Sequence, residues 1–514
     1  MSDDRQNEEN GDHQMTTVDA ATTPEVTTTA GRVSGVQRDG GVTAFLGIPF
    51  AAPPIGSRRF LAPQRPEAWS GSRPCDRFGP TPQRRPFGPV TTIPEPSIPG
   101  DDTLSVNVFT PAPGDARAAL PVLVWVHGGG YFAGSPASPW YDGTAFARDG
   151  VVVVTLSYRL GFDGFGWMSD APLNRGILDQ IAALEWVQEN IRAFGGDPTR
   201  VTIAGQSAGG GSVLTLMTSP RARGLFRAAI SHSGAAGHLA VATVEPIGRA
   251  FAAAMAVPPT RAGWLGVPEE TVLDHEREFN RVDGAWAPDV PTERVFAATA
   301  ADPMATSGLA FAPVVDGDSV VPVADAAAAG RGAEVSLLLG ATRNEFAFPG
   351  GTRLAEVVAA ATAAGIGDDA ISRFAAEVER VGEQYTGSQV AVLSMFRGPV
   401  VHIASQRVAG RAGEHTWLYD FAYHSPVDGL SAHCYDLPFA WGLPHAAGVD
   451  RVLGTAMPAA LTATMHGLWV EFVTTGRLPW AAASESMPGA MVFDTECGFD
   501  PGAYAFESEL LAPR

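Results

Sequence analysis

The chain has 514 residues, of which 45% are hydrophobic and 18% charged, so it can bury a large core and is not disordered throughout. Its 55 acidic residues outnumber 35 basic ones, and the net charge of −20 argues against phosphate-bearing partners such as nucleic acids and anionic membranes. Every basic residue is an arginine, which excludes mechanisms that need lysine: pyridoxal Schiff bases, P-loops and Ser–Lys hydrolases.

The chain begins with a polar, Thr-rich segment, residues 1–28, which predicts a disordered acidic tail. This segment lacks the basic and apolar regions of a secretory signal, and no later run is apolar enough to span a membrane. We therefore expect a cytoplasmic protein. No linker or repeat interrupts residues 29–514, which predicts one domain; two proline-rich stretches, 49–66 and 80–99, predict ordered surface loops or a lid.

Four short hydrophobic runs predict strands buried on both faces, as in a parallel sheet. They are Pro121–Val126, Val151–Leu156, Val201–Ala204 and Val335–Leu339. Between the second and third runs, Ile177–Ile191 carries an apolar stripe at helical spacing, and the Gly- and Pro-containing segment 194–198 ends it. Alternation of strand, helix and strand predicts a doubly wound α/β sheet with right-handed crossovers.

A glycine run follows the first predicted strand directly, in the segment His127–Phe132. Glycines here let the backbone N–H groups of Gly129 and Gly130 point into a site, where they can stabilise an oxyanion. We interpret His127 as a residue that shapes this loop rather than as a base or metal ligand.

The third predicted strand leads into the motif G-x-S-x-G at Gly205–Gly209, and an Ala/Leu/Met-containing segment continues to Met217. Strand, sharp turn and helix form the context in which this motif raises a serine above the sheet. The motif therefore predicts Ser207 as a nucleophile, with the N–H of Ala208 as a third oxyanion donor.

A serine nucleophile needs a base and an orienting acid, which follow it in the order acid, then histidine. Glu345 lies just beyond the fourth strand, where such sheets carry their sites; Asp316 is the competing acid, although its Asp-Gly sequence is typical of a turn. His433 follows a predicted strand, Trp417–Phe421, in a loop and is the leading base. We expect Cys434 beside it to pack rather than react.

Seven stretches of the sequence together resemble the type B carboxylesterases, which include cholinesterases and bacterial para-nitrobenzyl esterases. They are AFLGIPFAAPPIGSRRF at 44–60, VWVHGGGYFAGS at 124–135, SYRLGFDGF at 157–165, ALEWVQENIRAFGGDPTRVTIAGQSAGG at 183–210, FAPVVDGD at 311–318, GATRNEF at 340–346 and AHCYDLPFAWG at 432–442. They occur in the order of that family, and a family-like helix follows at 468–476.

The resemblance implies an α/β-hydrolase fold over residues 29–514: a large, mostly parallel sheet flanked by helices, with inserted helical and lid segments. It implies a catalytic triad of Ser207, Glu345 and His433 that hydrolyses small-molecule carboxylic esters through an acyl-serine intermediate. It also implies three oxyanion donors: Gly129, Gly130 and Ala208.

No cofactor or metal is needed for this chemistry, and the three cysteines fit neither a zinc site nor a disulfide framework. Two other functions stay open: the same site acting mainly on carbamates or amides, and a non-catalytic cholinesterase-like binding module. The sequence also leaves the oligomeric state open between a monomer and a weak dimer.

The chain departs from the family at two places. Thr103 and Thr81 stand where the family's early disulfide is usual, so that disulfide is absent. Phe346 stands directly after Glu345 where the family usually has glycine, which predicts a reshaped pocket wall.

Three predicted insertions surround the sheet and supply the binding surface: 80–100, 235–330 and 346–412. The last of these carries apolar side chains that either wall the pocket or form ordinary helical core: Phe346, Phe348, Met395 and Phe396.

Overall fold

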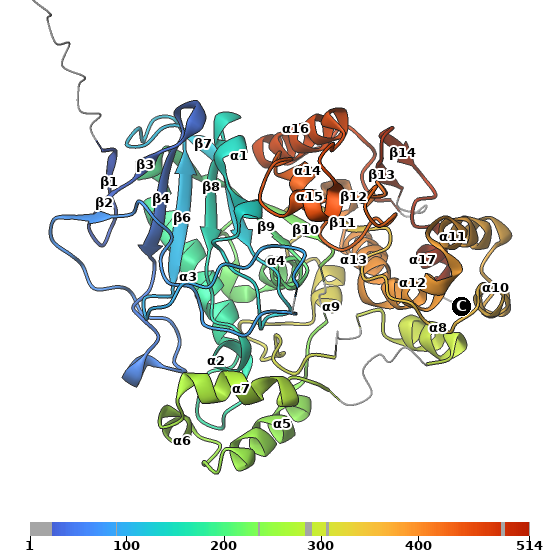
Figure 1. Cartoon of the computed structure of the whole chain (residues 1–514), viewed down its shortest axis with the longest axis horizontal. Coiled ribbons are helices and arrows are strands. Elements are labelled where there is room, and N and C mark those ends of the chain that lie inside the picture. Colours follow the sequence, from blue (N-terminus) through green and yellow to red (C-terminus); the bar gives the residue numbers. More distant parts are fainter. Residues whose placement is uncertain are drawn as a thin grey trace, which may run out of the picture.

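The protein is described by a computed structural model, which covers residues 23–88, 90–234, 237–282, 290–304, 308–484 and 489–512. A mixed sheet runs through these residues in the order β14-β13-β12-β11-β10-β9-β7-β8-β6-β4-β3 (Figure 1). Its strands in chain order are β3 (Val36–Gln37), β4 (Thr43–Pro49), β6 (Ser105–Thr110), β7 (Leu120–Val126), β8 (Val152–Leu156), β9 (Gly196–Gln206), β10 (Ala228–His232), β11 (Ser336–Thr342), β12 (Thr416–Phe421), β13 (Ala490–Phe493) and β14 (Gly498–Asp500).

The centre of the sheet is parallel, from β8 through β7, β9, β10, β11 and β12 to β13. Antiparallel pairs lie at the two edges, where β6, β4 and β3 follow β8 and where β14 follows β13. The predicted mostly parallel sheet is therefore confirmed. All five predicted strands are found as β7, β8, β9, β11 and β12. Neither β10, between β9 and β11, nor the outer strands β3, β4, β6, β13 and β14 were predicted from the sequence.

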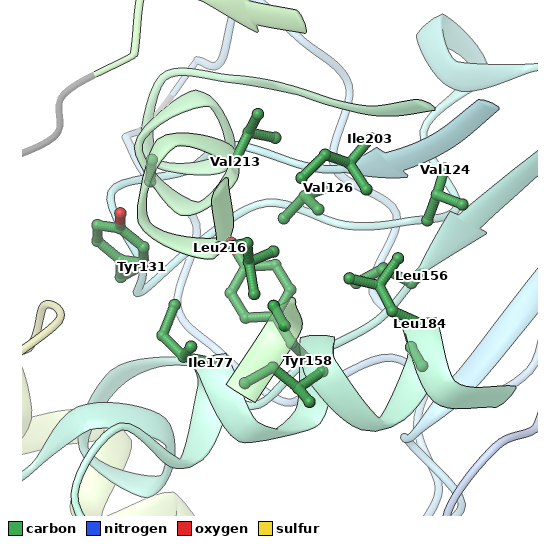
Figure 2. Close-up of a cluster of buried hydrophobic side chains, with 14 of the residues drawn as sticks. Val124, Val126, Tyr131, Leu156, Tyr158, Ile177, Leu184, Ile203, Val213 and Leu216 are labelled. Carbon is green, nitrogen blue, oxygen red and sulfur yellow. The ribbon is translucent and has the colours of Figure 1, made fainter. Parts of the chain in front are cut away.

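The two faces of the sheet pack against different helices because side chains alternate along each strand. On β7, Val124 and Val126 join one buried cluster, while Trp125 joins the other. Figure 2 shows the first cluster, in which the strand residue Leu156 lies beside the helix residue Leu184.

The first cluster lies under two helices, α3 (Arg175–Asn190) and α4 (Ala208–Thr218). The helix predicted over 177–191 corresponds to α3, which continues as a 3₁₀ turn to Phe194 and stops at Gly195, whose φ of 84° is left-handed. The second cluster lies under α16 (Ala459–Thr475), which contains the predicted helix at 468–476 up to its capping glycine, Gly476.

Two of the three predicted insertions form helical layers outside the sheet (Figure 1). Residues 237–328 contain α5 (Val241–Ala254), α6 (Arg261–Leu265), α7 (Glu269–Phe279), α8 (Thr292–Ala301) and α9 (Val323–Ala328). Residues 354–409 contain α10 (Leu354–Ala363), α11 (Asp368–Val381), α12 (Thr386–Val392) and α13 (Gly398–Ala409). The described part of the 80–99 stretch is a loop whose ends are joined by backbone and hydroxyl bonds between Thr81 and Ile98.

Of the predicted disordered tail, residues 1–28, the first 22 residues lie outside the described part of the chain. Its last part is a strand instead: β1 (Glu25–Thr27) pairs antiparallel with β2 (Arg32–Ser34), which pairs with β5 (Ser72–Pro74). The buried side chain of Val26 gives this strand a hydrophobic anchor. Across the described ranges, no helix combines the length and apolar character that a membrane crossing requires.

Candidate active site

Ser207 stands at the turn between β9 and α4, with φ 56° and ψ −122°. This conformation is strained for a residue with a side chain, and the surrounding backbone holds it. The N–H of Ser207 donates to the carbonyl of His232 at 2.9 Å, and its carbonyl accepts from Gly211 at 2.9 Å. The turn leaves the hydroxyl of Ser207 on the wall of a cavity at the carboxyl end of the sheet.

The two glycines of the motif are required by close backbone approach. A Cβ on Gly205 would lie 2.5 Å from the backbone of Gly209, and a Cβ on Gly209 would lie 2.1 Å from the carbonyl oxygen of Val126. Because neither neighbour is a flexible side chain, any larger residue would push the turn away from β7. The motif therefore marks a turn that only glycine can make at these positions.

The glycine loop after β7 brings free backbone donors beside the serine. Gly129 and Gly130 have left-handed φ values of 112° and 61°, and within the described ranges their N–H groups make no hydrogen bond. Gly129 and Ser207 both line the cavity. Gly130 directly follows Gly129, and Ala208 directly follows Ser207, so the N–H groups of Gly130 and Ala208 lie beside these lining residues.

His127 is fully buried beneath this loop. Its ring stacks on Tyr158 with centroids 4.6 Å apart, and its Nδ1 lies 2.8 Å from the carbonyl of Gly128. Burial lowers the pKa of His127 to about 4, so the ring is neutral at physiological pH. These contacts agree with a residue that shapes the loop.

Glu345 and His433 meet across two loops at the carboxyl ends of β11 and β12. A carboxylate oxygen of Glu345 accepts a hydrogen bond from Nδ1 of His433, and the other accepts from the N–H of Thr342 at 2.9 Å. The backbone N–H of His433 also donates to the carbonyl of Glu345 at 3.0 Å. Both side chains are buried, so the pair is held in one orientation.

The second ring nitrogen of His433 faces the side-chain amide of Gln206, at 2.8 Å. With Nδ1–H donating to Glu345, Nε2 accepts from this amide, which is the neutral tautomer that a general base needs. Ser207 makes no hydrogen bond to His433 within the described ranges, although both line the same cavity.

Burial alone lowers the pKa of His433, but the carboxylate of Glu345, which accepts the Nδ1–H of the ring, outweighs burial and raises the pKa well above the ordinary value of 6.5. The carboxylate favours the charged imidazolium, the form that a base takes after it has accepted a proton. The site is therefore arranged to receive a proton on Nε2.

Asn344 ties the acid loop to the histidine loop. Its N–H donates to the carbonyl of Ser431 at 3.0 Å, and its side-chain oxygen accepts from the N–H of Ser431 at 2.7 Å. Its amide nitrogen donates to Glu377 at 2.9 Å. Sequence reasoning missed both Asn344 and Gln206; only their positions directly before the proposed acid and nucleophile could have marked them.

The competing acid, Asp316, lies in a turn. Its side chain accepts from the N–H groups of Ser319 and Val320, each within 3.0 Å, and from the amide of Asn174. These bonds are those of an Asp that fixes a turn, as its Asp-Gly sequence suggested. Glu345 therefore takes the place of the acid beside His433.

The cavity at Ser207 has a volume of about 410 Å³. Its wall is mainly apolar and includes Phe87, Ile93, Phe346 and Phe348. Its wall carries the carboxylates of Glu95, Glu345 and Asp428 beside His433, and no arginine of the described part of the chain lines it. Such a cavity suits an uncharged molecule with an apolar group.

Comparisons with known proteins extend these observations. The model of the carboxylesterase family matches residues 22–364. A para-nitrobenzyl esterase of Bacillus subtilis is 34% identical over 520 residues, covering 95% of this chain and 98% of that protein. A liver carboxylesterase of Sus scrofa is 45% identical over 253 residues, covering 46% of this chain and 44% of that protein.

Solved structures agree over almost the whole chain. A PNB esterase superposes with a TM-score of 0.77 at 30% identity, covering 96% of this chain and 100% of that one. A carboxylesterase of Geobacillus stearothermophilus superposes with a TM-score of 0.73 at 30% identity, covering 94% of this chain and 99% of that one.

Proposed function

Because this chain belongs to the carboxylesterase family, has its α/β-hydrolase fold and is a carboxylic ester hydrolase, we propose that it cleaves esters through an acyl-Ser207 intermediate. The observation that carries this proposal is the convergence of Ser207, Glu345 and His433 on one cavity. Residues 29–514 then act as one catalytic domain, because strands from β3 to β14 belong to a single sheet.

The reaction begins when Oγ of Ser207 attacks the ester carbonyl carbon. Nε2 of His433 accepts the hydroxyl proton, and the amide of Gln206 leaves Nε2 as it does so. Glu345 keeps the imidazole in its tautomer and stabilises the imidazolium. His433 then gives the proton to the departing alcohol, and water activated by the same ring releases the acid from Ser207.

The negative charge that develops on the carbonyl oxygen is stabilised by backbone N–H groups. Gly129 and Gly130 have unpaired donors within the described ranges, and Ala208 begins the helix whose positive end lies behind the serine. A donor of this kind is worth about 3 kcal/mol of barrier in comparable hydrolases. The three donors therefore account for a large part of the expected rate.

The cavity supports uncharged apolar esters as substrates. Carboxylates of Glu95 and Asp428 line it, and Glu95 forms an ion pair with Arg84 at 3.1 Å. An anionic ester would meet these carboxylates without a lining arginine to offset them. We therefore expect para-nitrophenyl and para-nitrobenzyl esters of short uncharged acids to be turned over faster than anionic esters.

The test is a panel of para-nitrophenyl esters of increasing acyl length, run beside a carbamate and an anilide. Wild type is compared with two variants, Ser207→Ala and Ser212→Ala. Ser212 is a buried serine on α4 that does not line the cavity, and its hydroxyl accepts a hydrogen bond from Gln180 at 3.1 Å. We expect Ser207→Ala to lower kcat by about three orders of magnitude or more. Ser212→Ala keeps kcat within about threefold, because its hydroxyl bonds Gln180 and does not line the cavity.

Ester turnover by Ser207→Ala within tenfold of wild type would show that another group is the nucleophile. If the carbamate or the anilide were cleaved faster than every ester, Ser207 could still be the nucleophile. The preferred substrates would then be carbamates or amides instead of carboxylic esters.

A further inference from the structure

The imidazole of His433 lies against two phenyl rings that the reaction scheme above does not use. The ring of Phe346 is 4.3 Å from it, centroid to centroid, at an interplanar angle of 31°. The ring of Phe396 is 5.1 Å away at 49°, and the two phenyl rings are 5.7 Å from each other. His433 is therefore contacted by aromatic rings from two separate segments, the loop that follows β11 and the turn between α12 and α13.

An unusual helical turn presents Phe396 to the histidine. Residues Leu393–Arg397 form a π-helical turn, η7, between α12 and α13. Such turns hold an extra residue and are frequent at functional sites. Arg397, the next residue, is fixed by Asp420 and Glu507, and Phe396 itself is 3% exposed. The turn thus holds the phenyl ring in one place.

Phe346 approaches from the acid's own loop. It follows Glu345 directly, is 38% exposed and lines the cavity. Its ring lies against the imidazole, whose Nε2 faces the amide of Gln206. It occupies the position at which the sequence predicted a reshaped pocket wall.

The chemistry of this arrangement favours a charged imidazole. The face of a phenyl ring carries negative quadrupole charge, so it attracts a cation that lies over it more than the neutral form of the same group. His433 becomes a cation each time it accepts the proton of the nucleophile. Aromatic faces beside it therefore stabilise the state that the reaction passes through.

Few other groups can produce the same effect. From the acid loop the carboxylate of Glu345 faces the ring, from β9 the uncharged amide of Gln206, and from its own loop the thiol of Cys434. Burial raises the pKa of that thiol, so it stays uncharged. Glu345 is the one anion among these, and the phenyl rings supply a separate contribution.

We propose that Phe346 and Phe396 form an aromatic clamp that positions the ring of His433 and stabilises its protonated form during ester cleavage. The clamp consists of these two side chains only. It rests on the proposed role of His433 as the base. The two phenylalanines are positioning residues, since they act through the imidazole.

The experiment compares Phe346→Leu, Phe396→Leu and the double variant with wild type by the pH profile of kcat/KM for one para-nitrophenyl ester. Leucine keeps most of the apolar volume but has no quadrupole, so burial of the imidazole changes little. We expect the midpoint of the acid limb to fall by about half to one pH unit in each single variant and further in the double variant.

The matched control is Phe87→Leu, which also removes an aromatic ring from the cavity wall, but one that stacks on Phe132 at 5.2 Å. It is expected to change KM and leave the midpoint where it is. Midpoints that stay at the wild-type value in both clamp variants, or that shift equally in Phe87→Leu, overturn the clamp. Phe346 is partly exposed, so its variant folds even if that of Phe396 does not.

A further variant, His433→Asn, distinguishes a failure of the aromatic clamp from a failure of the proposed function. If that variant keeps wild-type turnover, the base is another residue and the proposed function fails, whatever the phenylalanine variants do. If it loses turnover while both clamp variants keep the wild-type midpoint, only the clamp fails.

Discussion

Three non-glycine residues with left-handed φ values meet at the candidate site: Ser207 at 56°, Glu345 at 45° and Cys434 at 75°. Each costs roughly 1 to 3 kcal/mol, and such strain persists only where surrounding bonds hold it. Here the bonds are those of Ser207 to β10 and of Glu345 to Thr342 and His433. The site is rigid because strained residues are tied to the ends of strands.

Residue types and spacing were enough to propose the nucleophile, the acid, the base and the glycine loop. They were not enough for Gln206, Asn344 or the phenyl rings at His433, because the role of each depends on which loops meet in space. Gln206 occupies a variable position of the G-x-S-x-G motif, so the sequence alone gives it no role. Its contact with His433 is found only when β9 is placed beside the loop of His433. The choice between pocket wall and helical core for Phe346 likewise needed the structure.

Gln206→Glu tests the electrostatics of the base at this scale. A carboxylate 2.8 Å from Nε2 would stabilise the imidazolium, so the pKa of His433 would rise further. Because only the neutral ring can accept the proton, activity is lost as pH falls through that pKa. We expect the acid limb of kcat/KM to move up by about one pH unit.

Gln206→Leu is the uncharged control and should not raise that midpoint. An acid limb in Gln206→Glu that lies at or below the wild-type position would contradict the assignment of His433 as the titrating base.

At the scale of elements, helix α7 holds the loop that closes one side of the cavity. Arg85 of the loop pairs with Glu270 at 2.6 Å and with Asp274, both on α7. In return, Arg277 of α7 donates to the carbonyl of Phe87, a residue of the cavity wall. Ion pairs and a hydrogen bond to α7 thus fasten this loop, in addition to the stacking of Phe87 on Phe132.

Arg85→Ala should therefore loosen the wall without touching the reacting groups. Exposed pairs are weak and screened by salt, so we expect KM to rise about two- to fivefold at low ionic strength with kcat within twofold. At about 0.5 M salt the difference from wild type should shrink. Michaelis curves at both salt concentrations measure this; equal KM values at low salt would show that the pairs do not hold the loop.

A second test on α7 concerns Glu276, whose carboxylate accepts from the N–H of Phe162 at 2.9 Å. Burial raises its pKa from 4.5 to about 7, partly offset by that N–H. Because the folded pKa lies above the unfolded one, its contribution to stability is fully present below pH 4.5. It is lost as pH rises through about 7, by up to about 3 kcal/mol.

Glu276→Gln removes this titration but keeps an acceptor for Phe162. The variant should gain thermal stability relative to wild type as pH rises from about 5 to 8, which melting temperatures at matched pH values would measure. A constant difference across that range would mean that Glu276 does not titrate there.

Sequence patterns located the elements that have the strongest signals. Runs of β-branched residues predicted β7 and β8, and an apolar stripe at helical spacing predicted α3. The helical segment stops at Gly195, inside the stretch 194–198 that was expected to end it. The strand β10 was missed because AAISH is short and rich in small residues, although pairing on both sides buries it. The π-helical turn η7 could not be predicted from the sequence, since no local pattern distinguishes it from the helices on either side.

For the whole molecule, the sheet brings residues from four distant segments to one edge. Gly129 follows β7, Ser207 follows β9, Glu345 follows β11 and His433 follows β12. These strands are parallel, so their carboxyl ends lie together, and the insertions close the cavity around them. The net charge of −20 and the absence of lysine fit this chemistry, which needs neither a basic surface nor an amine.

The most direct test of the account is to find where the acyl group is carried. Wild-type protein is mixed with a para-nitrophenyl ester and quenched in acid, and the acylated peptide is identified by mass spectrometry. We expect one acyl group per chain, on Ser207, which disappears in Ser207→Ala. An acyl group on any other residue, or turnover with no acylated peptide at all, would contradict it.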